Sequence, residues 1–327
     1  MTSYIIRRLF YMVPTLLIIS IISFIIIQLP PGDFITSYIA SLQQSGTQVS
    51  QSIIDSMRQR YGLNQPIYVQ YFKWITGVVQ GDLGMSFERN KPVAEIIGER
   101  ITLTAIVSIT SMAFSWVFGL IIGAYSAVRQ YSLFDYIWTF FGFLGRSIPN
   151  FMLALIFMYI SVWTFGTGAG GLFSPQYANA PWSMAKVVDL LKHLWVPVIV
   201  VGTAGTAGVI RIMRANLLDQ LGQPYVKAAR AKGLREWKLI LKYPFRVAIN
   251  PLISNLGFLF PRIVSGTIIT GVVLGLPTTG PMLLQALLAQ DMYLAGSFIL
   301  IIASLTVFGV LISDILLAWS DPRIRYD

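Results

Sequence analysis

Six long apolar runs constrain the fold of this chain more than any other feature. About 20 predominantly apolar residues cross the hydrocarbon core of a bilayer as a helix. Only 12% of the residues are charged, whereas soluble domains carry about a quarter. The chain is therefore predicted to be an all-α membrane protein with six transmembrane helices. The runs lie at roughly Leu9–Leu29, Ile101–Val128, Tyr136–Phe165, Leu194–Ile212, Pro251–Leu276 and Tyr293–Trp319.

The distribution of basic residues predicts the topology. The loop Arg211–Arg246 contains nine Lys/Arg but only Asp219 and Glu236 as acids, and loops this basic remain on the cytoplasmic side. The segment Thr279–Phe298 has no Lys or Arg and is expected outside. With six spans, both termini are then cytoplasmic. The net charge of +10 is explained by these loops flanking apolar runs, so it does not indicate a nucleic-acid partner.

The same pattern divides the chain into four parts. Residues 1–29 form a cytoplasmic N-terminus and first span, which is too long for a signal peptide and lacks a small-x-small cleavage site. Residues 30–98 form an extracytoplasmic lobe, expected to fold into helices and Gly-rich turns. Residues 99–319 form a five-span core containing the cytoplasmic loop 213–247, and residues 320–327 form a cytoplasmic tail.

The sequence offers little for catalysis or metal binding. The chain has no cysteine and a single histidine, His193, so a site with nitrogen or sulfur ligands is not expected. It has no GxxxxGK[ST] phosphate-binding loop and no HExxH motif. We therefore expect neither a metal nor a cofactor in this chain, and no intramembrane enzyme activity.

The segment Gln223–Gly233, QPYVKAARAKG, is the most informative motif. A helix is predicted over Leu217–Lys232 along the cytoplasmic face, with Gly233 in the left-handed conformation that ends it. A second, amphipathic helix is predicted over Leu234–Tyr243. The alanines would let a partner protein approach closely, although an ordinary positive-inside loop explains the basic charge equally well.

This segment resembles the cytoplasmic "EAA" loop of binding-protein-dependent ABC importer permeases, in the version found in the oligopeptide/dipeptide permease family. Lys227 stands where the name-giving Glu would be. Further pieces resemble the B-type subunit of that family in order along essentially the whole chain. They are YIIRRL near the N-terminus, PPGD at Pro30–Asp33, YGLNQPIYVQYFKWITGVVQGDLGMSF at Tyr61–Phe87, SIPNF at Ser147–Phe151 and DPRIRY at Asp321–Tyr326.

The resemblance implies the type I ABC importer permease fold, with the loop helix as a coupling helix seated in a cytoplasmic ATPase. It implies a bacterial or archaeal inner-membrane location among lipids, with a second permease subunit and two ABC ATPases that bind ATP and Mg. It also implies an extracytoplasmic binding protein, received by the outside lobe. The residues expected to couple to the ATPase are Tyr225, Lys227, Ala228, Ala229, Arg230, Ala231, Lys232 and Gly233.

The resemblance implies di- or oligopeptides as substrate. Relatives of this architecture also carry oligosaccharides, opines and nickel chelates, which remain open. A channel or an intramembrane enzyme would be a different class. A channel would conduct without ATPase partners, and an enzyme would need catalytic residues that the sequence lacks.

Two arginines fall inside predicted spans. Arg146 lies shortly before Pro149, and Arg262 follows Pro261. Ionisable residues at membrane depth usually face a cavity or a partner, so Arg146, Asn150 and Arg262 are candidates for the lining of the substrate path. In that case the substrate is expected to be anionic. Snorkelling to the headgroups, or pairing with an acid of the partner subunit, is an equally open alternative for the arginines.

Overall fold

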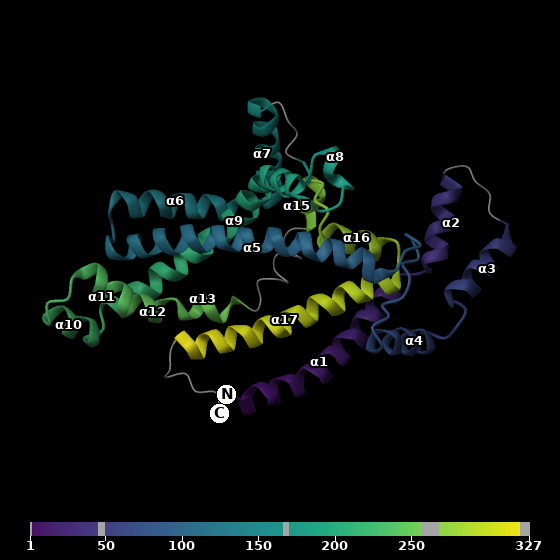
Figure 1. The fold of residues 1–327 in the computed structure, drawn as a ribbon, viewed down its shortest axis with the longest axis horizontal. Helices are drawn as coiled ribbons and strands as arrows, with labels where there is room; N and C mark the ends of the chain where they lie inside the picture. Colours follow the sequence, from purple (N-terminus) through teal and green to yellow (C-terminus); the bar gives the residue numbers. More distant parts are fainter. Residues whose placement is uncertain (1, 45–49, 166–169, 257–267, 321–327) are drawn as a thin grey trace. The chain divides into compact units, whose positions relative to one another are not determined.

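The computed structural model describes residues 2–44, 50–165, 170–256 and 268–320, and these form helices joined by short connections (Figure 1). Within these ranges the β-structure is one isolated bridge, between Met85 and Pro92. The all-α prediction is confirmed. The helices are α1 (Thr2–Gln28), α2 (Phe34–Gln44), α3 (Gln51–Tyr61), α4 (Ile67–Val79), α5 (Val93–Val128), α6 (Leu133–Ser147), α7 (Asn150–Phe165), α8 (Pro175–Ala178), α9 (Met184–Leu221), α10 (Pro224–Ala231), α11 (Glu236–Lys242), α12 (Pro244–Ala248), α13 (Asn250–Ser254), α15 (Ile268–Val273), α16 (Thr279–Leu288) and α17 (Met292–Ser320).

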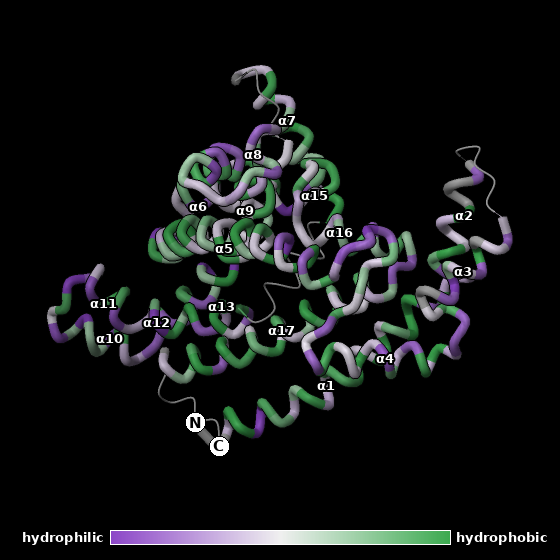
Figure 2. The backbone as a smooth tube through the Cα atoms, turned by 45° about the vertical axis from the view of Figure 1, so that its right-hand side comes forward, coloured by the Kyte–Doolittle hydropathy of each residue, from purple (hydrophilic) through white to green (hydrophobic). Residues whose placement is uncertain are grey.

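Four helices, α1, α5, α9 and α17, are long and apolar enough to cross a bilayer, and the bent pair α6–α7 makes a fifth span if counted as one. Hydrophobic residues follow these helices along most of their length, whereas α10 and α11 carry many hydrophilic residues (Figure 2). The remaining predicted span, Pro251–Leu276, includes residues 257–267, which lie outside the described residues. Its two ends are the short helices α13 and α15.

The predicted span Tyr136–Phe165 is not one straight helix. Helices α6 and α7 meet at 103°. Ile148, between them, has an extended backbone (φ −85°, ψ 124°), because the ring of Pro149 disfavours helical geometry in the residue before it. The polypeptide therefore bends sharply beside Arg146, where the sequence had predicted a continuous membrane helix.

The chain forms two compact units, residues 1–5, 105–277 and 306–327 in one, and residues 6–104 and 278–305 in the other. In the first unit, α5, α6 and α9 lie side by side (Figure 1). Small residues allow this approach: a Cβ on Gly202 would lie 2.6 Å from the Phe114 ring, and one on Gly119 would lie 2.6 Å from Val209. Small residues at crossings are typical of helices that associate in membranes.

In the second unit, aromatic side chains form the core. Phe24, Trp74, Phe87 and Phe298 are all buried, together with aliphatic residues of α5 and α16. Asp291, fully buried, anchors the start of α17: it accepts hydrogen bonds from Ser86 Oγ (2.5 Å) and from the Leu294 amide (3.2 Å). Burial raises the pKa of Asp291, despite these hydrogen bonds.

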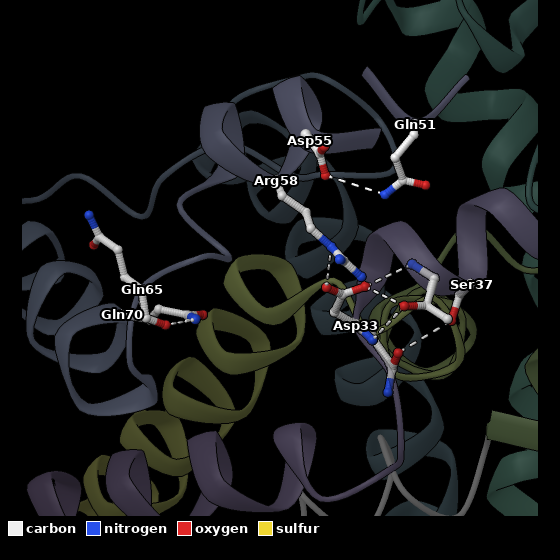
Figure 3. A network of polar contacts seen from close by, with 9 residues as sticks. Asp33, Ser37, Gln51, Asp55, Arg58, Gln65 and Gln70 are labelled. Carbon is white, nitrogen blue, oxygen red and sulfur yellow. Dashed lines mark hydrogen bonds and ion pairs between the residues drawn. The ribbon is translucent and has the colours of Figure 1, made fainter. Parts of the chain in front are cut away.

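Helices α2 and α3 of the second unit are linked by Asp33 (Figure 3). Asp33 precedes α2 and accepts hydrogen bonds from the Thr36 amide (2.8 Å) and hydroxyl (2.6 Å), as N-cap residues do. Arg58 of α3 lies 3.3 Å away, from its Nε to Oδ2 of Asp33. Partial burial acts to raise the pKa of Asp33, but the Thr36 hydrogen bonds and the Arg58 charge outweigh it, and the pKa is lowered.

Candidate functional site

The basic segment after α9 folds into two short helices. The single helix predicted over Leu217–Lys232 is wrong in one respect: α9 ends at Leu221, and α10 starts separately at Pro224. Proline lacks the backbone N–H and is favoured at the first position of a helix, so it starts α10 anew. Gly233, with φ +78°, adopts the left-handed conformation predicted for the end of this helix.

Helix α10 packs on α11 through one small apolar cluster. Val226 and Leu239 are fully buried and Ala229 is 8% exposed. Ile240 is packed against this cluster and also against the core that α9 forms with α12 and α13. The two short helices are therefore joined to the membrane-length helix α9 through side-chain packing.

The packing buries one of the eight predicted coupling residues and leaves the others exposed. Ala229 faces α11, so it is not available to a partner. The other seven are exposed. Among these, Tyr225 donates a hydrogen bond to the Gln220 side chain (2.7 Å). The exposed residues are Tyr225, Lys227, Ala228, Arg230, Ala231, Lys232 and Gly233.

The basic side chains of this segment also differ in whether they are paired within the loop. Arg230 holds Glu236 of α11 in a two-pronged contact, with Nη2 3.2 Å from Oε2. The hydrogen bond and charge of Arg230 lower the pKa of Glu236. Arg230 is thus engaged within the loop, whereas Lys227 of α10 and Lys232, directly after it, form no ion pair in the described part of the chain.

The three predicted substrate-path residues are placed as follows. Arg146 lies exposed in the last turn of α6, and Asn150 begins α7 on the other side of the bend, half-buried. Arg262 lies outside the described residues.

A polar constellation that the sequence analysis did not single out ties α6 to α9. Asp135 is buried and binds the guanidinium group of Arg214. Asp135 also belongs to the start of α6: Ser132 Oγ accepts a hydrogen bond from its amide (3.3 Å), and its carboxylate accepts one from the Tyr131 amide (3.0 Å). This arrangement is similar to a capping box, except that the returning carboxylate binds the amide of the residue before the N-cap and not the amide of the N-cap itself. The Ser132-x-x-Asp135 spacing is the signal that could have revealed it.

Arg146 shares a groove between α6 and α9 with two further arginines. Arg211 and Arg214 line it from α9, three residues apart. Helices α6 and α9 run antiparallel, since Asp135 meets Arg214 while Gly145 lies against Thr203. The groove therefore runs from the start of α6 toward the bend.

Comparisons with known proteins define the class of this chain. Residues 119–326 match the family described as "Binding-protein-dependent transport system inner membrane component", and residues 1–110 match the N-terminal region described for such membrane components. The chain belongs to this family, the membrane permease subunits of ABC importers. Such subunits are non-catalytic inner-membrane proteins, and partner ATPases hydrolyse the ATP.

Individual relatives are similar over their full length. The chain is 36% identical over 331 residues to the oligopeptide transport system permease protein AppB of Bacillus subtilis, covering 100% of both chains. It is 31% identical over 339 residues to the dipeptide transport system permease protein DppB of Alkalihalophilus pseudofirmus, again covering 100% of both. It is 30% identical over 326 residues to the glutathione transport system permease protein GsiC of Escherichia coli, with the same coverage.

Proposed function

We propose that this permease subunit imports di- or oligopeptides delivered by an extracytoplasmic binding protein. The observation that carries the proposal is the full-length similarity to permeases named for oligopeptides, dipeptides and glutathione. Oligosaccharides and opines remain the alternative within the same architecture.

The transporter is proposed to contain a second permease subunit of the same family and two ATPases. The exposed face of α10 docks in a groove of one ATPase, and ATP-driven closure of the ATPases moves α9 through the α10–α11 cluster. Six spans with both termini inside are the topology that fits this arrangement, with residues 30–98 outside. Asn150 and Arg262 are proposed to contact the solute along the path.

Reconstitution tests this function directly. The complete transporter, with its partner permease, ATPases and binding protein, is expected to accumulate labelled peptides in liposomes in the presence of ATP. Oligosaccharides and opines of similar size serve as competitors. If an unlabelled oligosaccharide abolished accumulation of the label and an unlabelled peptide did not, the peptide assignment would be overturned. The permease class would be left intact.

A further inference from the structure

Two adjoining hollows lie between α6 and α9, at the side of the bend. One, of about 450 Å³, is lined mainly by apolar and aromatic side chains of α5, α6, α7 and α9. The other, of about 200 Å³, is the arginine-lined groove. They share four lining residues and so adjoin each other, as an apolar part and a basic part of one candidate site. The shared residues are Trp138, Gly142, Ala207 and Ile210.

The basic part carries uncompensated charge. Arg214 is neutralised by Asp135. Neither Arg146 nor Arg211 makes an ion pair or a hydrogen bond within the described ranges. An arginine stays charged at any physiological pH. Two positive charges that line one small groove repel each other, and a groove at membrane depth screens that repulsion poorly. An anion bound between the two arginines would relieve this repulsion.

The directions of the two side chains support the same point. The Cα–Cβ bonds of a helix tilt toward its N-terminus. Because α6 and α9 are antiparallel, the side chain of Arg146 leans back toward the start of α6, and that of Arg211 leans toward the bend. Both side chains therefore start out toward the part of the groove that lies between the two residues, and both residues line it.

The depth of this stretch favours a transported solute over a lipid headgroup. Arg146 is 13 residues after Leu133, the first residue of α6, or about 20 Å along the helix axis. The hydrocarbon core is about 30 Å thick. In the topology proposed above, on which this step rests, α6 starts at the cytoplasmic surface. Arg146 then lies near the middle of the membrane, and Arg211, one turn of α9 from the Asp135–Arg214 pair, lies between Arg146 and the cytoplasmic surface. Secondary transporters hold their substrates near the membrane midplane beside broken helices.

We infer that this space is a solute-binding site that takes a carboxylate between Arg146 and Arg211 and an adjoining large apolar side chain in the aromatic hollow. In terms of the proposed function, the solute is a peptide whose C-terminal residue is apolar. Arg146 keeps its expected place on the substrate path, and Arg211 joins it as a second specificity-determining residue.

The charge is tested with a matched pair of substrates in the reconstituted complete transporter. The pair is a tripeptide ending in phenylalanine with a free carboxylate, and the same tripeptide as its C-terminal amide. Each variant is compared with wild type for each peptide separately, so that the preference of the unchanged binding protein cancels. Arg211→Gln and Arg146→Gln are each expected to reduce uptake of the free acid about tenfold or more, since each removes a charged hydrogen-bond partner, and to change amide uptake less than about twofold.

Arg129→Gln is the control variant, because Arg129 is exposed just after α5 and does not line the groove. It is expected to leave both peptides unaffected. Arg211→Lys retains the charge and is expected to recover part of the discrimination. Losses that are equal for acid and amide would overturn the site. A structural role, or a lipid bound in the groove, would produce that result, and the lipid would then be detected by mass spectrometry as a phospholipid that leaves with Arg211→Gln.

The apolar part is tested at Gly142, which lines both hollows. A Cβ added to Gly142 would meet no atom within 4 Å, so Gly142→Leu extends into the open space without a clash at Cβ. This variant is expected to reduce uptake of a tripeptide ending in phenylalanine about tenfold and to spare one ending in glycine. Equal transport of both peptides by Gly142→Leu would contradict the assignment. Wild-type transporter that imports no peptide would instead contradict the proposed function.

Discussion

Arg214 donates one hydrogen bond from Nε to Oδ1 of Asp135 and another from Nη2 to Oδ2, each 2.8 Å long. The acid and the base are 79 residues apart in the sequence. Their contact fixes the first turn of α6 against α9, and it leaves Arg211, one turn earlier in α9, without an acidic neighbour in the described part of the groove.

The Asp135–Arg214 pair is expected to be important for stability because Asp135 is 2% exposed. Removing one member of a buried ion pair leaves an uncompensated charge and costs about 3–5 kcal/mol. Asp135→Asn and Arg214→Gln are therefore each expected to lower the unfolding temperature of the purified subunit. The double variant should be less destabilised than the sum of the two. Strict additivity in this double-mutant cycle would show that the pair contributes nothing as a pair.

The exposed face of α10 is expected to couple to the ATPase independently of loop folding. Ala228→Glu adds bulk and negative charge to the exposed face, so ATPase co-purification and substrate-stimulated ATP hydrolysis should be lost while the subunit still inserts. Ala229→Glu should instead disrupt the loop itself, since it places a charge between Val226 and Leu239. Normal stimulated hydrolysis by an assembled Ala228→Glu complex would remove α10 from the coupling role.

The proposed topology can be mapped with single cysteines, because the chain contains none. The exposed Gln80, just after α4, and the exposed Gln223, just before α10, are suitable positions. Ser86 is unsuitable because it is fully buried and bound to Asp291. A cysteine at Gln80 should react with an impermeant maleimide in intact cells, and one at Gln223 should react only after permeabilisation. The opposite pattern would invert the topology.

The link between α2 and α3 is expected to weaken in acid. The folded-state pKa of Asp33 lies below its ordinary value of 3.8, so the charged form contributes stability that is complete above pH 3.8 and is lost as the pH falls below it. The protection factors of the amides in α2 and α3, which are exchange rates corrected for the intrinsic rate at each pH, should therefore fall below this pH. Asp33→Asn removes the titrating group and should give protection factors at this site that do not change with pH. A wild-type profile as flat as that of Asp33→Asn would exclude Asp33 as the cause.

Local signals in the sequence predicted much of the helical architecture. Apolar runs identified α1, α5, α9 and α17, and Gly233 identified the end of α10. Pro149 and Pro224 stand at the two places where the prediction was too simple. Each proline ends or starts a helix through backbone geometry, which hydropathy over a window of residues does not register.

The groove could not be predicted because it depends on distant pairing. In the sequence, Arg211 and Arg214 look alike, as two basic residues near the cytoplasmic end of a span. Only the fold shows that Asp135 neutralises one of them and not the other. The position of Ala229 is a similar case, because a shift of one position along α10 determines whether a side chain faces α11 or solvent. Sequence alone indicated that the alanines are small, and it did not indicate which neighbour each one meets.

The packing of α10 on α11 has a mechanical consequence. A flexible loop would have to be ordered when the ATPase binds, and ordering side chains and loops reduces affinity. Here Val226, Ala229 and Leu239 order the loop beforehand, and Ile240 continues that packing to the core of α9. In the proposed transporter, a loop ordered in this way would pass a displacement of the ATPase surface on to the membrane helix, because the connection between them is packed and not flexible.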